Sequence, residues 1–436
     1  MANSRKHLIY LVYGRQTYHQ EALFSIASAF AHLRDGAAHG LTVRVYTDDP
    51  SPYAGLPVQV REVTAEELVA WCQPHGYHFR AKHVALRDAL EDADQALLID
   101  TDTFFHSSPL RLFDRIQPGS LLCNAIGARY GEHRNFPLYR DLSPYLFERG
   151  WADDEMHQLN SGVIGLPREE AKILDRSLEL MDELYPIANG AYTLEEFVLA
   201  VAAHKRLELV GCTDLIHHYW SRKQLFRAKI QAWLCKHGSS LLSAAALDDT
   251  LKVTDRLPRP PRAKRLLYKL GTLPLPAPMR QFSIELLYGC HEYSNEFDRA
   301  CGPVWWEKAA TNAIERYPQE PIAEQIEDWL NHSLLRNLLG SRANEIRQHL
   351  RQRDLLGPQP SVDAAPGPPT QGRERTGQRP RPGARPCPRG HPFDTGHRAH
   401  TQRRGQTFRP GRQGPKVDRS SQNLVISQQP ASPRPI

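Results

Sequence analysis

Short apolar runs alternate with longer amphipathic stretches over about the first two hundred residues. The runs are rich in β-branched and aliphatic residues, and the stretches between them place apolar residues three and four positions apart. This pattern is typical of a parallel, nucleotide-binding type of sheet covered by helices. We predict strands at residues 7–12, 42–46, 58–63, 95–99, 121–126 and 161–166. We predict helices at residues 20–33, 65–75 and 79–90, with Thr64 and Glu67 forming a capping box at the second.

The pattern becomes mostly helical from Glu169 onward, with Pro-rich breaks near residues 257–262 and 273–279. We predict helices at 168–184, 193–204, 221–235, 303–316 and 321–339. Their apolar residues are predicted to pack back on the sheet; these are Trp305, Trp306, Trp329, Leu330 and residues 334–339. The predicted organisation is an α/β domain at 1–225, a mostly helical extension at 226–356 and a basic tail at 357–436.

Charge is unevenly distributed along the 436 residues. Lys and Arg number 55 against 49 Asp and Glu, but residues 357–436 hold 14 of the former and 4 of the latter, a net charge of +10. The remaining 41 basic and 45 acidic residues give residues 1–356 a net charge of −4. The tail is rich in Pro, Gly, Gln and Arg, so we expect it to be disordered. Its scarcity of aromatic residues argues against a stable nucleic-acid partner, although binding of RNA or anionic lipid stays open.

Seven cysteines lie far apart without zinc-binding spacing, and no apolar run approaches the roughly 18 residues of a membrane span. We therefore expect a cytoplasmic protein without a transmembrane segment.

Residues 96–105, ALLIDTDTFF, join an apolar strand to two carboxylates. Ligands of open α/β sheets gather at the carboxyl ends of strands, where Asp100 and Asp102 fall. Carboxylates separated by one residue can bind one divalent cation, which can bridge the oxygens of a diphosphate. We predict a cation site there, and the alternative is that both residues cap the following loop.

The same tripeptide also resembles the motif of haloacid-dehalogenase-type phosphohydrolases. In that reading Asp100 attacks phosphate and Asp102 serves as acid and base. Those enzymes need a later acidic pair on a strand, and neither residues 153–154 nor residues 248–249 follow a strand-like run. The phosphohydrolase is therefore the alternative function.

Residues 157–166, HQLNSGVIGL, distinguish the two readings. Together with the DxD strand they resemble the glycogenin and bacterial lipopolysaccharide glycosyltransferase family, in which an Asn-Ser-Gly strand follows the DxD. The resemblance implies a GT-A type mixed sheet flanked by helices, with Thr101, Asn160 and Gly162 close to the donor. A glycine beside a small serine is also what close backbone approach needs, and a plain turn is the alternative.

Earlier strand ends carry further residues that match the resemblance. It implies that Tyr13, Gly14 and Asp48 contact the base and ribose of the nucleotide, and that Arg80 and Lys82 supply positive charge near it. An exposed helix face explains Lys82 equally well.

Glu195 and Glu196 stand where that family has an Asp-Gln pair facing the sugar. By resemblance they join Asn160 as catalytic residues, but the difference leaves the donor sugar and the mechanism open. A cluster of charge at a helix start is the competing explanation.

Residues 215–223, LIHHYWSRK, resemble the family's late histidine segment. The resemblance implies that His218 or His217 is the third metal ligand and that Lys223 contacts the diphosphate. A neutral imidazole beside two carboxylates suits Mn²⁺ better than Mg²⁺. The predicted reaction is transfer of a hexose from a nucleotide sugar, with UDP-sugar favoured, to a hydroxyl group of a glycan, lipid or protein, with retention of configuration. A nucleotide-sugar-binding protein without activity is a further alternative.

Overall fold

The computed structural model describes residues 4–33 and 40–356, which belong to one compact unit. The tail predicted to be disordered, residues 357–436, lies outside the described residues. Among the helices of the described segments, none is both long enough and apolar enough to cross a membrane.

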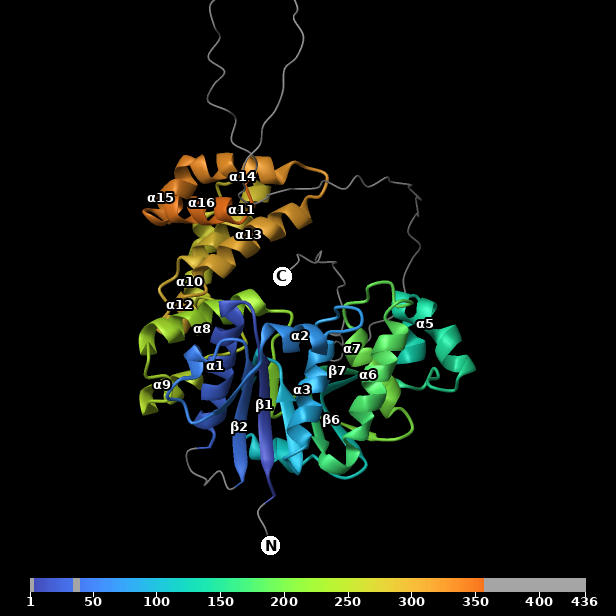
Figure 1. Ribbon diagram of the computed structural model, residues 1–436. Coiled ribbons are helices and arrows are strands. Elements are labelled where there is room, and N and C mark those ends of the chain that lie inside the picture. Colours follow the sequence, from blue (N-terminus) through green and yellow to red (C-terminus); the bar gives the residue numbers. More distant parts are fainter. Residues whose placement is uncertain (1–3, 34–39, 357–436) are drawn as a thin grey trace, which may run out of the picture. The chain divides into compact units, whose positions relative to one another are not determined.

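A seven-stranded sheet forms the centre of the first half of the chain, with the strand order β3-β2-β1-β4-β7-β6-β8 (Figure 1). Its strands are β1 (Lys6–Val12), β2 (Leu41–Thr47), β3 (Gln59–Glu62), β4 (Gln95–Ile99), β6 (Ser120–Arg129), β7 (His157–Pro167) and β8 (Glu208–Gly211). A separate two-stranded sheet pairs β5 (Thr103–Phe105) with β9 (Ile216–His218). All six predicted strands form, and the three missed strands have only three or four residues each.

The sheet is mixed, so the predicted α/β fold with a mixed sheet flanked by helices is confirmed. The wholly parallel arrangement suggested by the alternating pattern is wrong, because β7 runs antiparallel to both β4 and β6. The other neighbouring pairs are parallel. A strand buried on both faces has the same continuous apolar run in either direction, so its sequence does not reveal its orientation.

Alternate residues of each central strand enter different cores, as the two-residue period of a strand requires. Leu8 and Tyr10 of β1 contribute to the core beneath α1 and α8, whereas Ile9 contributes to the core beneath α3, α6 and α7. The predicted capping box of Thr64 and Glu67 is present at α2. The helices in this part are α1 (Gln16–Ala31), α2 (Ala65–Trp71), α3 (Arg80–Leu90), α4 (Leu110–Phe113), α5 (Pro137–Glu148), α6 (Lys172–Leu184), α7 (Leu194–Ala203), α8 (Lys223–His237) and α9 (Ala244–Thr250).

The helices after α9 are α10 (Arg262–Gly271), α11 (Ala277–Gly289), α12 (Glu296–Arg299), α13 (Gly302–Arg316), α14 (Ile322–Asn331), α15 (Ser333–Leu339) and α16 (Arg342–Gln352). Most of them build a core of their own, but Phe297 of α12 belongs to the core beneath α1 and α8. Trp306, Trp329 and Leu330 pack among these helices rather than on the sheet, so that prediction is wrong. An amphipathic face shows that a helix is buried on one side but not which partner covers it.

Some helix boundaries in this region coincide with prolines and others do not. The predicted helix at 321–339 is two helices, because the backbone at His332 is extended. Pro261 and Pro276, which we treated as parts of breaks, are the N-caps of α10 and α11. The predicted boundary after residue 225 stays a prediction, and Phe226, Ile230 and Trp233 of α8 belong to the core under the sheet.

Candidate active site

The ends of three strands and the first half of a fourth meet at one edge of the large sheet. Strands β1, β2 and β4 are parallel, so the residues after them, Gly14, Asp48 and Asp100, lie at the same edge. Strand β7 is antiparallel and therefore brings its first half, rather than its end, to that edge. The Asp100 backbone N–H donates to the Gly162 carbonyl oxygen at 2.9 Å, which places the DxD loop directly beside the Asn-Ser-Gly segment.

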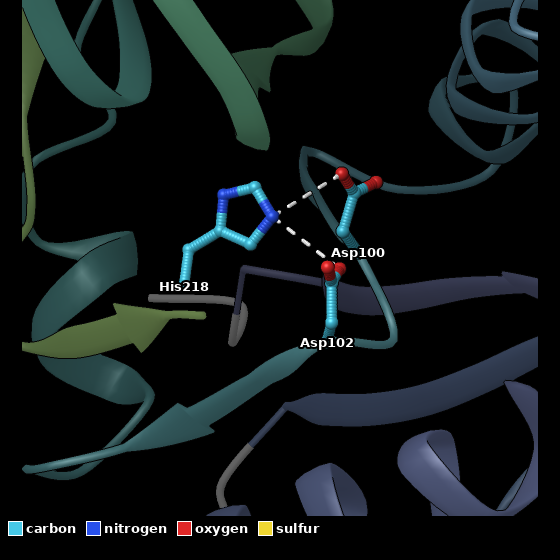
Figure 2. Close-up of side chains that lie close together, drawn as sticks. All are labelled: Asp100, Asp102 and His218. Carbon is cyan, nitrogen blue, oxygen red and sulfur yellow. Dashed lines mark ion pairs between the residues drawn. The ribbon is translucent and has the colours of Figure 1, made fainter. Parts of the chain in front are cut away.

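Asp100, Asp102 and His218 converge at this edge (Figure 2). One ligand atom from each residue can be chosen so that all lie within 4.8 Å of one another. The His218 Nε2 atom is 3.3 Å from Asp102 Oδ1 and 3.9 Å from Asp100 Oδ2. The pairing of β5 with β9, with Thr103 opposite His218, brings the histidine to the loop that bears both aspartates. Two carboxylates and one imidazole form a donor set that suits Mn²⁺ and similar divalent cations.

Asn160 determines which nitrogen of His218 carries the proton. Its Nδ2 donates to Glu196 at 3.4 Å and its Oδ1 accepts from the Gly162 N–H at 3.2 Å, so these two contacts fix the orientation of the amide. The same Oδ1 lies 2.9 Å from His218 Nδ1, which must therefore be the donor. When Nε2 carries no proton, its lone pair faces the two carboxylates, which is the form that binds a metal; when Nε2 is protonated, it can donate to Asp102.

Position 162 must be a glycine, because the His218 ring occupies the space that a side chain would fill. A Cβ atom built on Gly162 would lie 2.1 Å from the Nδ1 atom of His218, far closer than any normal contact. The absent side chain therefore makes room for the histidine ring. The structure supplies a reason for the glycine that differs from the predicted proximity to the donor sugar.

Two lysines hold the two aspartates. The Lys223 Nζ atom is 2.9 Å from Asp102 Oδ2, and the buried Lys82 Nζ atom is 3.0 Å from Asp100 Oδ1. Burial alone would raise the pKa of Asp102, but the hydrogen bonds and charges of Lys223 and of His218 in its protonated form hold that pKa well below its usual range. Burial lowers the pKa of Lys82, yet Asp100 and Glu195 outweigh this effect and raise it. The exposed-face explanation of Lys82 is therefore wrong, because its side chain is 9% exposed.

Glu195 and Glu196 have different environments although they are adjacent. Glu195 is buried, lies 3.6 Å from Lys82 and accepts from Ser161 Oγ at 2.8 Å. Burial opposes its ionisation, but Lys82 and His83 lower its pKa. Burial and the charge of Glu195 raise the pKa of Glu196 to about 7, and Lys82 offsets only part of this. Glu195 is thus an ionised partner of the lysine, and Glu196 is the carboxyl poised to change protonation near neutral pH.

The predicted nucleotide-contacting residues lie at the ends of β1 and β2. The Gly14 N–H donates to Asp48 Oδ2 at 2.9 Å, and Gly14 has a φ of +86°, which a glycine adopts without strain. Tyr13 donates its hydroxyl to the His78 carbonyl oxygen at 3.2 Å. The two strand ends are therefore joined by a direct hydrogen bond.

Three further residues were predicted to belong to the site: Arg80, His217 and Thr101. Arg80 is not brought to the cluster, since its guanidinium Nε pairs with Asp182 Oδ1 of α6 at 2.8 Å. The His217 ring packs against Phe104, with ring centroids 5.2 Å apart. Neighbouring residues of a strand point to opposite faces, so only one of the two histidines can face the aspartates. Thr101 lies between Asp100 and Asp102, partly exposed.

Our sequence analysis missed several residues around the cluster. Ser161 accepts from Lys82 through its carbonyl oxygen at 3.0 Å, and the fully buried His83 lies 3.0 Å from Glu195. Tyr192 packs edge-to-face on Phe79 and is 68% exposed, and the charges of Lys223, Asp100 and Asp102 reach it. Ser161 was inside the recognised motif, whereas nothing in the sequence distinguished Tyr192.

No protein-family model and no curated protein sequence matches this chain. Solved structures with a similar chain path include the galactosyltransferase LgtC in complex with donor and acceptor sugar analogs, at 12% identity and a TM-score of 0.38, covering 58% of this chain and 97% of that one. The bifunctional glycosyltransferase WbbM has 11% identity and a TM-score of 0.33, covering 48% of this chain and 39% of that one. Mouse xyloside xylosyltransferase 1 has 12% identity and a TM-score of 0.32, covering 48% and 85%. Such likenesses identify neither a substrate nor an activity for this chain.

Proposed function

We propose that this chain is a metal-dependent glycosyltransferase of GT-A type that uses a nucleotide-sugar donor, with UDP-sugar favoured, and a hydroxyl acceptor. The observation that carries the proposal is the convergence of Asp100, Asp102 and a correctly oriented His218 at the edge where four strands place their polar residues. The family resemblance of the DxD and Asn-Ser-Gly segments agrees with it.

Asp100, Asp102 and His218 would hold Mn²⁺, or Mg²⁺ with weaker preference, and the bound cation would supply positive charge to the diphosphate as the sugar bond breaks. Lys223 has a 40% exposed side chain and is the cation of this group that can turn toward a phosphate. Lys82 is enclosed by Asp100, Ser161 and Glu195, and we assign it the role of holding Asp100 in place. Tyr13, Gly14 and Asp48 would contact the nucleoside.

Asn160 and Glu196 are the residues that we place nearest the sugar, with Glu195 behind them. Asn160 would also keep the His218 ring in its metal-binding tautomer. If the configuration is retained, as the resemblance implies, the leaving phosphate can take the acceptor proton and no dedicated base is required. Stabilising the developing diphosphate charge is then the main task of the protein.

The phosphohydrolase alternative agrees less well with the contacts of the two aspartates. Its acid and base, Asp102, has a pKa held low by protonated His218 and by Lys223, and a carboxyl group with a lowered pKa is a poor proton donor near neutral pH. The later acidic residues are also paired elsewhere. Asp153 contacts His204 and Lys205, and Asp249 contacts Lys236, His237 and Lys252.

Thermal stability should be measured with UDP, GDP and UDP-sugars, with and without Mn²⁺. We expect UDP with Mn²⁺ to stabilise the protein by about 3 kcal/mol at a hundredfold excess over its dissociation constant. Asp102→Asn should abolish this effect. Asp214→Asn, which removes an exposed aspartate paired with Arg115 at 2.7 Å, should preserve it.

Turnover needs its own measurement, namely release of UDP from a UDP-sugar in the presence of Mn²⁺. Binding without release would indicate a nucleotide-sugar-binding protein without activity. A lack of response to every nucleotide, together with phosphate release from a simple aryl phosphate, would contradict the proposal and support the phosphohydrolase.

A further inference from the structure

Helix α10 presents an apolar stripe that no other part of the described chain covers. Leu266, Leu267, Leu270 and, just beyond the helix, Leu273 are 58%, 57%, 52% and 54% exposed. These four leucines, which we call the α10 stripe, fall within residues 266–273. Single exposed leucines are ordinary, but several on one face of one helix require an explanation.

The stripe lies on the side of α10 that is turned away from its neighbour α11. Leu266 and Leu267 lie four and three positions before Leu270, so each is a neighbour of Leu270 on the same side of the helix. Tyr268, on the opposite side, is partly buried, and its hydroxyl lies 3.3 Å from His291 Nδ1, just after α11. Helix α10 is thus packed on one side only, and its most apolar side is the free one.

Cations flank the stripe without any acidic residue. Arg262, Lys264 and Lys269 of α10 are all exposed. Residues 256–284 contain seven Lys or Arg and no Asp or Glu, although residues 1–356 carry a net charge of −4. A local excess of cations in an acidic protein favours a negatively charged partner.

We propose that the α10 stripe and its flanking cations dock on the surface of an anionic lipid bilayer. A basic helix with leucines along one face inserts that face at the level of the headgroups and places its cations among the anionic lipids. This inference does not depend on the proposed transferase activity.

Charge argues against two other partners for the α10 stripe, namely the residues after 356 and a second copy of the protein. The residues after 356 carry a net charge of +10, so their average charge repels the α10 cations. A symmetric contact between two copies would bring Arg262, Lys264 and Lys269 of each copy toward those of the other. An anionic bilayer is the partner that satisfies both the leucines and the cations.

The test is sedimentation of the full-length protein with vesicles of phosphatidylcholine alone and of phosphatidylcholine mixed with phosphatidylglycerol. We expect binding to the mixed vesicles that weakens as salt is added. Replacing Leu266, Leu267 and Leu270 by Gln should weaken it at least about tenfold. A control, Leu251→Gln, changes a leucine that is 54% exposed outside the stripe and should leave binding unchanged.

A second variant tests the charge. Replacing Arg262, Lys264 and Lys269 by Gln should weaken binding to the mixed vesicles on the order of a hundredfold. A control variant with Lys172, Arg206 and Lys308 replaced by Gln removes three exposed cations from other elements and should have a much smaller effect.

Three outcomes would overturn the proposal. One is an absence of binding to both kinds of vesicle. Another is binding that the leucine variant leaves intact, which would assign it to other basic residues such as those after 356. The third is a leucine variant that changes the mass of the particle in solution without changing vesicle binding, which would identify the stripe as a contact between copies. Circular dichroism of every variant verifies that it folds.

Discussion

Glu196→Gln should make the protein more stable at neutral and alkaline pH but not at acidic pH. Burial and the negative charge of Glu195 raise the Glu196 pKa from 4.5 to about 7. Glutamine has nearly the same shape and stays neutral, so it removes the repulsion without emptying the site.

The magnitude follows from the difference between the two pKa values. A rise of the pKa from 4.5 to about 7 corresponds to about 3 kcal/mol in the free energy of unfolding, and the protein loses this stability when the carboxyl ionises in the folded state. Because the folded pKa is the higher one, the stability from this group is fully present below about pH 4.5 and is lost as the pH rises through about 7. The variant should therefore match the wild type at low pH and exceed it by about 3 kcal/mol above neutrality.

Urea unfolding of both proteins at several pH values between about 4.5 and 8 measures this difference. The exposed Glu315 provides a control, since Glu315→Gln should show little change with pH. A gain from Glu196→Gln that is the same at every pH would refute the reasoning. So would a loss above neutrality, which would mean that Ser161 and Asn160 stabilise the ionised carboxylate more than Glu195 opposes it.

Other substitutions test the remaining contacts. Gly162→Ala should lower the affinity for Mn²⁺ at least about tenfold in a calorimetric titration, because the new Cβ displaces His218; unchanged affinity would exclude His218 as a ligand. Lys82→Met should cost about 3–5 kcal/mol in urea unfolding, because it leaves the buried Glu195 without its cation, and a cost below about 1 kcal/mol would show that the pair is not needed. Thr64→Ala should cost about 1 kcal/mol through loss of the α2 cap, with no change in Mn²⁺ affinity; an equally stable variant would contradict the capping argument.

The position of the DxD pair was predictable from local sequence. An uninterrupted apolar run predicts a buried strand, and polar residues directly after such a strand must lie at its end. Asp100 and Asp102 follow β4 as expected, and the capping box of α2 also depends only on residues close in sequence. Local patterns were reliable wherever the responsible contacts were local.

The missed elements have equally physical causes. Strands β5 and β9 have three residues each and are held by their pairing with one another, which no window of sequence reveals. Prolines that we treated as breaks begin α10 and α11, because a proline at a helix start lacks only an N–H that would be unpaired anyway.

The sequence alone determined which residues are capable of the chemistry: two carboxylates after a strand, an amide, two glutamates and a histidine segment. Tertiary structure decided which of them meet. The antiparallel insertion of β7 sets Asn160 against His218, the β5–β9 pairing selects His218 over His217, and the burial of Glu196 beside Glu195 raises its pKa. The sequence gives the residue types of each segment. The distances between side chains, the tautomer of His218 and the pKa of Glu196 depend on which distant segments meet in one low-dielectric site.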